Sequence, residues 1–172
     1  MNTFAVEIFD DTGTHCTFYT VRWDDSELSE TDKFFEKYED HKEFGKSLME
    51  MASFLNQVIA NDYGALDDFF RFENSAQALP PAGKYQIGEL HVNFYNFPLR
   101  LYCLKITENI LVLFNGSEKT AQTAQGGKTS MTFHNANEFA KRITDALNDG
   151  TIIVSNKKRQ LLYYNSSTDI LL

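Results

Sequence analysis

The sequence has few of the features that mark secreted, membrane or disulfide-rich proteins. It contains two cysteines among 172 residues, Cys16 and Cys103, too few for a disulfide framework. No apolar run approaches the roughly 18–20 residues needed to span a bilayer. Residues 1–20 show no basic segment followed by an apolar stretch, so no signal peptide is expected. These absences predict a cytoplasmic protein that needs no membrane, with both thiols buried as small apolar side chains.

Recognisable catalytic and cofactor motifs are also absent. The sequence has no GxGxxG or Walker A loop, and no HExxH or CxxC pair. The four histidines are scattered over different segments, so neither a metal site nor a cofactor is expected. Asp24-Asp25 and Asp67-Asp68 are adjacent pairs, and neighbouring residues do not share a face of a helix or strand. These pairs therefore do not indicate an acid/base dyad.

Basic residues are in the minority, with 16 Lys and Arg against 24 Asp and Glu, giving a net charge of −8. Such a balance disfavours a general nucleic-acid binder, because phosphate contacts need cations. The distribution is uneven: residues 1–50 hold 13 acidic and 5 basic residues, whereas residues 84–172 hold 7 acidic and 10 basic. The asymmetry is open to two interpretations, an ordinary solvated helix face or a small cationic surface in the C-terminal half.

Apolar residues make up 42% of the chain, including 15 Phe and 8 Tyr, enough for one ordinary core. Their spacing predicts a single α+β domain over 1–172, with an antiparallel central sheet at about 88–115 packed by helices. We expect an N-terminal hairpin and acidic helix over 1–40, a core over 42–122, and a helix plus hairpin over 135–172. The individual predictions are strands at 3–9, 17–23, 90–95, 99–106 and 110–114, helices at about 29–39, 42–61, 65–72 and 135–147, a loop at 73–87 and a C-terminal hairpin.

Residues 98–122 contain the least ordinary feature, the charged Arg100 within a strand that is otherwise apolar. A buried guanidinium is costly unless it is paired, so Arg100 needs a carboxylate, carbonyl groups or an open cleft beside it. Pairing through the 107–109 turn would place Arg100 or Leu101 opposite residues 114–117. Lys119 follows the second strand, so both cations would lie at one edge of the sheet.

The segment PLRLYCLKITENILVLFNGSEKTAQ resembles the RelE/ParE toxin superfamily, especially its phage-associated HigB-like branch. The shared features are a strand with Arg beside an aromatic residue, a short hairpin, an apolar strand, a Gly turn, and Lys followed by Thr. The segment is also similar to a group of uncharacterised bacterial proteins with an LRLYCL…ILVL…G…K core. The match covers about 25 residues, and the compatible element order extends over 42–122. The acidity, the greater length and Glu118 beside the expected lysine depart from the family pattern.

The resemblance implies a RelE-like fold and a toxin of a bacterial toxin-antitoxin system, acting as a ribosome-dependent mRNA endoribonuclease. It also implies a helix-turn-helix antitoxin as the partner. In that chemistry a ribose 2′-OH attacks the adjacent phosphate, which requires positive charge and proton transfer. Arg100 and Lys119 would stabilise phosphate charge, and Tyr102 and His91 are candidates for proton transfer or base stacking. Basic residues that would hold RNA are Lys84, Lys105, Lys128, Lys157, Lys158 and Arg159.

Each of these residues also has a structural explanation. Arg100 would equally serve as a buried ion-pair partner, Tyr102 as a core residue, and His91 and the lysines as solvated surface. The alternative function is a non-catalytic protein-interaction module on the same fold. Acidity and the absence of an evident acid/base pair favour it, as do three aromatic residues expected at an exposed edge, Phe94, Tyr95 and Phe97.

Overall fold

The computed structural model describes residues 2–119 and 128–172, and it is built around a seven-stranded sheet. The strand order is β11-β1-β2-β8-β7-β4-β3, and every neighbouring pair is antiparallel except β2 and β8. The sheet is therefore mixed, with an antiparallel majority, and the predicted α+β class is confirmed. The strands are β1 (Phe4–Asp10), β2 (Thr17–Trp23), β3 (Arg71–Glu73), β4 (Ala76–Leu79), β7 (Leu99–Thr107), β8 (Ile110–Glu118) and β11 (Ile170–Leu171).

The predicted N-terminal hairpin is present as β1 and β2, and it is part of the central sheet. β2 lies parallel to β8, with Thr17 opposite Ile110 and Thr20 opposite Leu113. The predicted C-terminal hairpin forms as β9 (Ile152–Ser155) and β10 (Gln160–Tyr163), a separate two-stranded sheet. The last strand, β11, then pairs with β1 and closes one edge of the large sheet.

The prediction that residues 90–95 belong to the central sheet is wrong. β6 (Leu90–Asn93) pairs only with β5 (Lys84–Ile87), in a second two-stranded sheet. The neighbour of β7 is instead β4, which lies within the segment predicted as a loop. Ala76 and Ala78 of β4 are fully buried, and their small side chains allow α3 to pack closely over this strand. Because alanine has a low strand propensity, the sequence pattern did not predict a strand here.

The helices follow the predictions in part. α1 (Glu30–Tyr38) begins after Ser29, whose Oγ accepts the Asp32 N–H at 3.0 Å as an N-cap. The predicted helix over 42–61 is α2 (Gly45–Ser53) continued by a π-helix, η1 (Phe54–Tyr63), and one 3₁₀ turn, η2 (Asp67–Phe69), follows. α3 (Lys128–Asn148) begins well before the predicted Asn135 and ends before Gly150, as expected.

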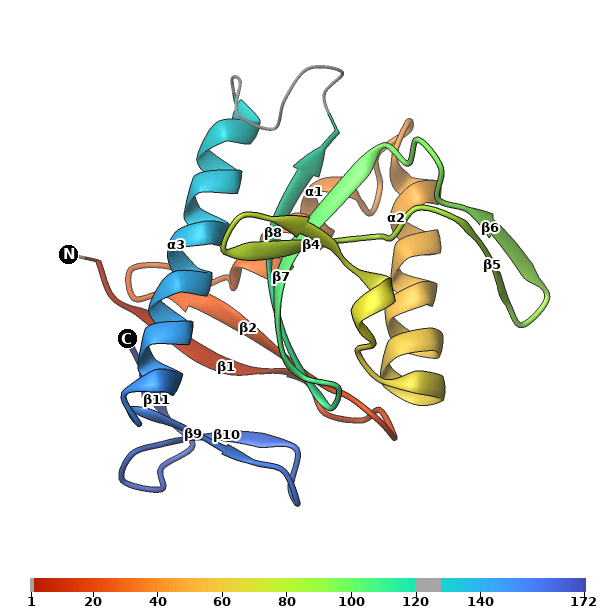
Figure 1. Ribbon diagram of the computed structural model, residues 1–172. Helices are drawn as coiled ribbons and strands as arrows, with labels where there is room; N and C mark the ends of the chain where they lie inside the picture. The colour runs from red at the N-terminus through yellow and green to blue at the C-terminus, as the bar shows by residue number, and fades with distance from the viewer. Residues whose placement is uncertain (1, 120–127) are drawn as a thin grey trace.

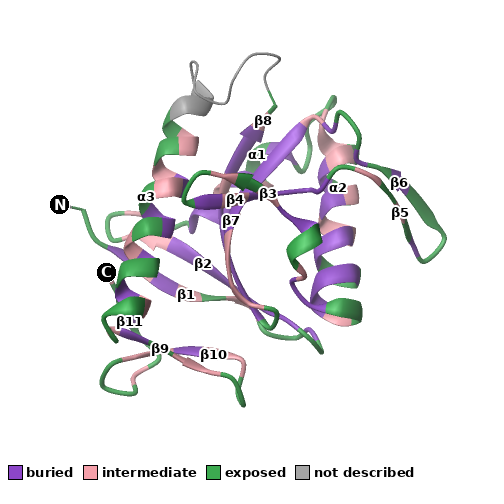
Figure 2. Ribbon diagram, in the orientation of Figure 1, coloured by how far each residue is buried: buried purple, intermediate pink, exposed green. Residues whose placement is uncertain are grey.

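Both faces of the central sheet are covered by helices (Figure 1). Along β7, Leu99, Leu101 and Cys103 pack into one core with α1, α2 and η1, while Tyr102 belongs to a second core with α3. Figure 2 shows the central strands largely buried between these layers. Within 2–119 and 128–172, no helix is long and apolar enough to cross a membrane.

Candidate functional site

Arg100 lies on the face of β7 that α3 covers, and its side chain is only 9% exposed. Its Nη1 donates hydrogen bonds to the carbonyl oxygens of Phe97 and Leu99, each at 3.0 Å. Among the described residues, no carboxylate lies within ion-pairing distance of it. Burial, together with the nearby charge of Arg71, lowers the pKa of Arg100 to about 10. Arg100 therefore stabilises the start of β7 by donating hydrogen bonds to these two backbone carbonyl groups.

Tyr102 shares this face of β7 and is 1% exposed. Its ring meets Phe133 of α3 edge to face, with 5.8 Å between the ring centroids. Burial raises the pKa of its hydroxyl. Arg100 and Tyr102 thus lie on one face of β7, as their spacing requires, and α3 packs over this face at Tyr102.

Lys119 follows β8 and is exposed, and its backbone N–H donates to the Pro98 carbonyl at 2.6 Å. The predicted pairing through the 107–109 turn is confirmed, because Arg100 lies opposite Ser117 and Leu101 opposite Gly116. The backbone hydrogen bond to Pro98 therefore holds Lys119 next to the start of β7.

His91 and Lys84 lie on a separate structure, the β5–β6 arm (residues 84–93), which extends from the body of the molecule beside α2 (Figure 1). Directly paired residues of antiparallel strands share a face. Gln86 pairs with His91 and Lys84 with Asn93, so these four polar side chains point to the same side of the arm. All four are exposed. The structure thus brings together two predicted residues that lie on different strands.

A pocket of about 300 Å³ lies on the arm, and six residues of β5 and β6 line it. None of the lining residues is acidic, although the chain as a whole carries a net charge of −8. The lining residues are Lys84, Tyr85, Gln86, His91, Val92 and Asn93.

The remaining predicted RNA-binding residues do not converge. Lys105 Nζ forms a 2.6 Å ion pair with Asp67, and Arg159 Nη1 donates to the Gly13 carbonyl at 2.9 Å. Lys157 and Lys158 are exposed on the turn between β9 and β10. Lys128 begins α3, and its side chain lies outside the described part of the structure. Among the described residues, these side chains lie on separate elements of the fold, β7 and the β9–β10 turn.

Of the three aromatic residues expected at an exposed edge, only Tyr95 is exposed, at 58%. Phe94 and Phe97 are buried in the core beside α2 and η1, with their ring centroids 5.0 Å apart. That part of the prediction is wrong because the chain turns inward after β6. Phe94 N–H bonds to the Gly83 carbonyl at 2.7 Å, which closes the base of the arm.

A cluster that the sequence did not indicate lies where α1 meets the end of β8. Tyr38 Oη donates to Glu118 Oε2 at 2.6 Å, and Lys37 Nζ lies 3.8 Å from the same oxygen. Nearby, His41 Nδ1 accepts the N–H groups of Glu43 and Phe44. Tyr38 and Glu118 are separated by 80 positions, so no local pattern could have linked them.

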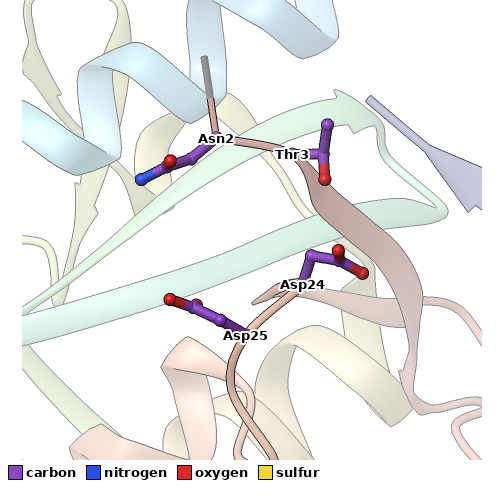
Figure 3. Close-up of a pocket in the computed structure, with 4 residues that line it drawn as sticks. All are labelled: Asn2, Thr3, Asp24 and Asp25. Atoms are coloured by element: carbon purple, nitrogen blue, oxygen red, sulfur yellow. The ribbon is translucent and has the colours of Figure 1, made fainter.

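A second polar pocket, of about 250 Å³, is lined by Asn2, Thr3, Asp24 and Asp25 (Figure 3). The figure shows the carboxylates of Asp24 and Asp25 pointing away from each other. Within the described ranges, no three His, Cys, Asp or Glu side chains are grouped to hold a metal ion. This pocket therefore offers neither a carboxylate dyad nor a metal centre.

Comparisons with protein-family models, with curated proteins and with solved structures find no match to this chain. The resemblance to RelE and HigB toxins therefore stays a prediction.

Proposed function

We propose that the chain is a non-catalytic binding module that engages a protein partner through the β5–β6 arm. The observation that carries this proposal is the coverage of the central sheet on both faces. Arg100 and Tyr102, the residues that the toxin interpretation needs most, are both buried: Tyr102 packs beneath Phe133 of α3, and Arg100 is bonded to the Phe97 and Leu99 carbonyls. An RNA phosphate would reach Tyr102 only if α3 moved away from the core that it forms with Phe139, Ala140 and Ile143.

The arm has the properties of a recognition element. Its inner face is fixed to the body by Tyr85, whose ring centroid lies 5.0 Å from that of Phe54 in η1. Its outer face is polar, exposed and hollowed by the 300 Å³ pocket. Figure 2 shows the arm as largely exposed beside a buried sheet. A rigidly anchored hairpin with a free polar face suits binding, because little conformational entropy is lost when a partner docks.

The second candidate is the toxin-like mRNA endoribonuclease, neutralised by a helix-turn-helix antitoxin and acting on mRNA at the ribosome. Two observations favour it: Lys119 is exposed at the end of β8, and Lys84 lies on the same face of the arm as His91. An ammonium group and an imidazole are suited to stabilising a phosphate and moving a proton. In this proposal the site of mRNA cleavage would lie at the arm or at the end of the sheet next to Lys119, and not at Arg100.

Controlled expression in a bacterial host distinguishes the two proposals. Growth and newly formed transcript ends would be measured for the wild-type chain and for Lys119→Ala, His91→Ala and Arg100→Met. The binding-module proposal predicts no new transcript ends with well-expressed, folded protein. Growth arrest with new ends, relieved by Lys119→Ala or His91→Ala, would establish the endoribonuclease instead.

A second experiment tests the arm itself. A photo-crosslinking amino acid would replace His91, and a matched control would carry it at Lys157 on the distant β9–β10 turn. We expect irradiated cells to give a discrete adduct at position 91 that protease removes and ribonuclease does not. An adduct removed by ribonuclease would favour the second candidate, and equal labelling at both positions would refute a role of the arm.

A further inference from the structure

The backbone of the arm leaves an edge at which another strand can pair. Within the described chain, β6 pairs with β5 on one side and with no strand on the other. An unpaired strand edge offers a row of N–H and C=O groups, and proteins use such edges to bind extended peptides as an added strand. The inner side of the arm is anchored by Ile87 and Val92, both buried, so the edge is held in place.

The side chains on the two faces of the arm define what an added strand would carry. On the outer face, Lys84 and His91 provide cationic or donor groups, and Asn93 Oδ1 already accepts the Tyr95 N–H at 2.9 Å, leaving its NH₂ group to donate. No carboxylate lines this pocket, and Glu89 lies in the tip turn between the two strands. The face therefore complements an anionic side chain.

The other face of the arm presents Leu90, which is 40% exposed, next to buried Val92. Successive side chains of a strand alternate between the two faces. A peptide paired with β6 would thus place every second residue beside His91 and Asn93, with Lys84 on the same face one strand further away, and the residues between them beside Leu90. The two faces together select a strand in which acidic and apolar residues alternate.

We propose that the arm binds an extended acidic segment of a protein partner as a third strand beside β6, with its carboxylates beside His91, on the face that also carries Lys84, and its apolar side chains at Leu90. This inference rests on the proposed binding function and names the chemistry of the ligand. The acidic helix α1 does not occupy this surface, because it packs against β2 and β8.

Fluorescence anisotropy with defined peptides tests the inference on the full chain. The probe is a labelled nonapeptide of alternating Glu and Val, and the comparison peptide has the same composition with the Glu residues in one block. We expect saturable binding of the alternating peptide below about 1 mM and at least a tenfold weaker affinity for the block peptide. No saturable binding, or equal binding of the two peptides, would overturn the inference.

Two further experiments test which groups make the contacts. Lys84→Glu combined with His91→Glu should weaken binding at least tenfold, whereas Lys157→Glu combined with Lys158→Glu, a matched control on the β9–β10 turn, should change it less than twofold. Methylation of alternate backbone nitrogens of the peptide keeps its charge and removes the N–H donors needed for strand pairing. The affinity of the methylated peptide should therefore also be at least tenfold weaker. A methylated peptide that binds equally well would exclude strand addition.

A labelled oligouridylate of the same length distinguishes the macromolecule. Binding of this RNA that depends on Lys84 and His91, without peptide binding, would overturn the inference in favour of the second candidate. If the alternating peptide fails to bind while the crosslinker at position 91 still captures a protein, the inference fails and the binding function stands. If neither result is obtained, both fail.

Discussion

The hydroxyl of Tyr38 donates a 2.6 Å hydrogen bond to Glu118 Oε2, and this bond joins the end of α1 to the end of β8. Tyr38 is completely buried, and burial raises the pKa of its hydroxyl, which the bond to Glu118 raises further. Burial by itself would raise the pKa of Glu118 as well. The bond from Tyr38, the Glu118 backbone N–H and the charges of Lys37 and His41 outweigh that effect and lower it.

Tyr38→Phe removes this hydroxyl and keeps the ring in the core. We expect the free energy of unfolding to fall by about 1–2 kcal/mol, because a partly buried hydrogen bond to a charged group is lost. Urea unfolding followed by circular dichroism measures the change. The same substitution made in a Glu118→Gln background should cost less, and equal costs in the two backgrounds would show that the pair does not interact.

The lowered pKa of Glu118 predicts a dependence of stability on pH. A carboxyl group whose pKa is lower in the folded state stabilises that state above its ordinary value of 4.5, and the contribution is lost as pH falls through the folded-state pKa. The stability difference between the wild type and Glu118→Gln should therefore be constant from pH 6 to 7 and shrink below about pH 4.5. Urea unfolding across this range tests it, and a difference that grows as the pH falls would contradict the assignment.

Elements that depend on local signals were predictable from the sequence. The acidic helix predicted at about 29–39 corresponds to α1, and the two apolar runs on either side of the 107–109 turn predicted β7, β8 and their register. β4 was not predicted because alanine has a weak strand propensity. Ala76 and Ala78 are held in the sheet by packing against α3, which no local pattern reveals. The parallel pairing of β2 with β8 joins residues more than 90 positions apart, and no local pattern encodes it.

For the candidate site, the need of Arg100 for buried partners was predictable, but their identity was not. The acceptors are backbone carbonyls of Phe97 and Leu99, whose positions follow from the turn into β7. The association of Lys84 with His91 depends on the register of the arm, in which β5 lies within the predicted loop over 73–87 and β6 within the predicted strand over 90–95. Composition and periodicity do not predict which residues come together through the pairing of separate strands.

Arg100→Ala should lower the free energy of unfolding by about 2–4 kcal/mol, since it removes the packed stem and leaves two carbonyls without their donor. Arg100→Met keeps most of the volume and removes the buried charge, so its stability should lie within about 1 kcal/mol of the wild type. Chemical denaturation of the two variants side by side measures this. If Met proves as damaging as Ala, the guanidinium bonds and not the packing maintain this end of β7.

Two buried hydroxyl groups should respond differently to removal. Among the described residues, Ser117 Oγ is the buried side-chain polar atom without a well-formed hydrogen bond, although it lies near enough to the Tyr102 hydroxyl to lower the pKa of that group, so Ser117→Ala should change stability by less than about 1 kcal/mol. Thr31 Oγ1 bonds to Thr20 Oγ1 at 2.6 Å and lies 3.0 Å from the Leu113 carbonyl, so Thr31→Val should cost about 1–3 kcal/mol. Thermal unfolding of both variants checks the contrast, which equal losses would refute.

The two thiols should be inert while the protein is folded. Both cysteines are free and buried, as the sequence predicted. Burial raises the pKa of Cys16 to about 12 and that of Cys103 well above its ordinary value, so almost no thiolate is present at neutral pH. A thiol-reactive dye should label neither residue over minutes in buffer and both in denaturant. Rapid labelling of Cys16 in the native protein would mean that the β1–β2 turn opens.

Gly116 lies on β8 opposite Leu101, at a point where the backbones and α1 crowd together. A Cβ at this position would collide with the Arg100 carbonyl oxygen and stand 2.7 Å from Phe34 Cε2. Since a strand backbone cannot move aside without disturbing its pairing, Gly116→Ala should destabilise the fold by about 3 kcal/mol or more. Gly88→Ala is the matched control: it lies in the arm turn at φ +60° with nothing within 4 Å, so it should cost only about 1 kcal/mol, from the left-handed backbone. Urea unfolding ranks the two variants. A Gly116 variant as stable as the Gly88 variant would mean that β7, β8 and α1 pack less closely than the structure describes.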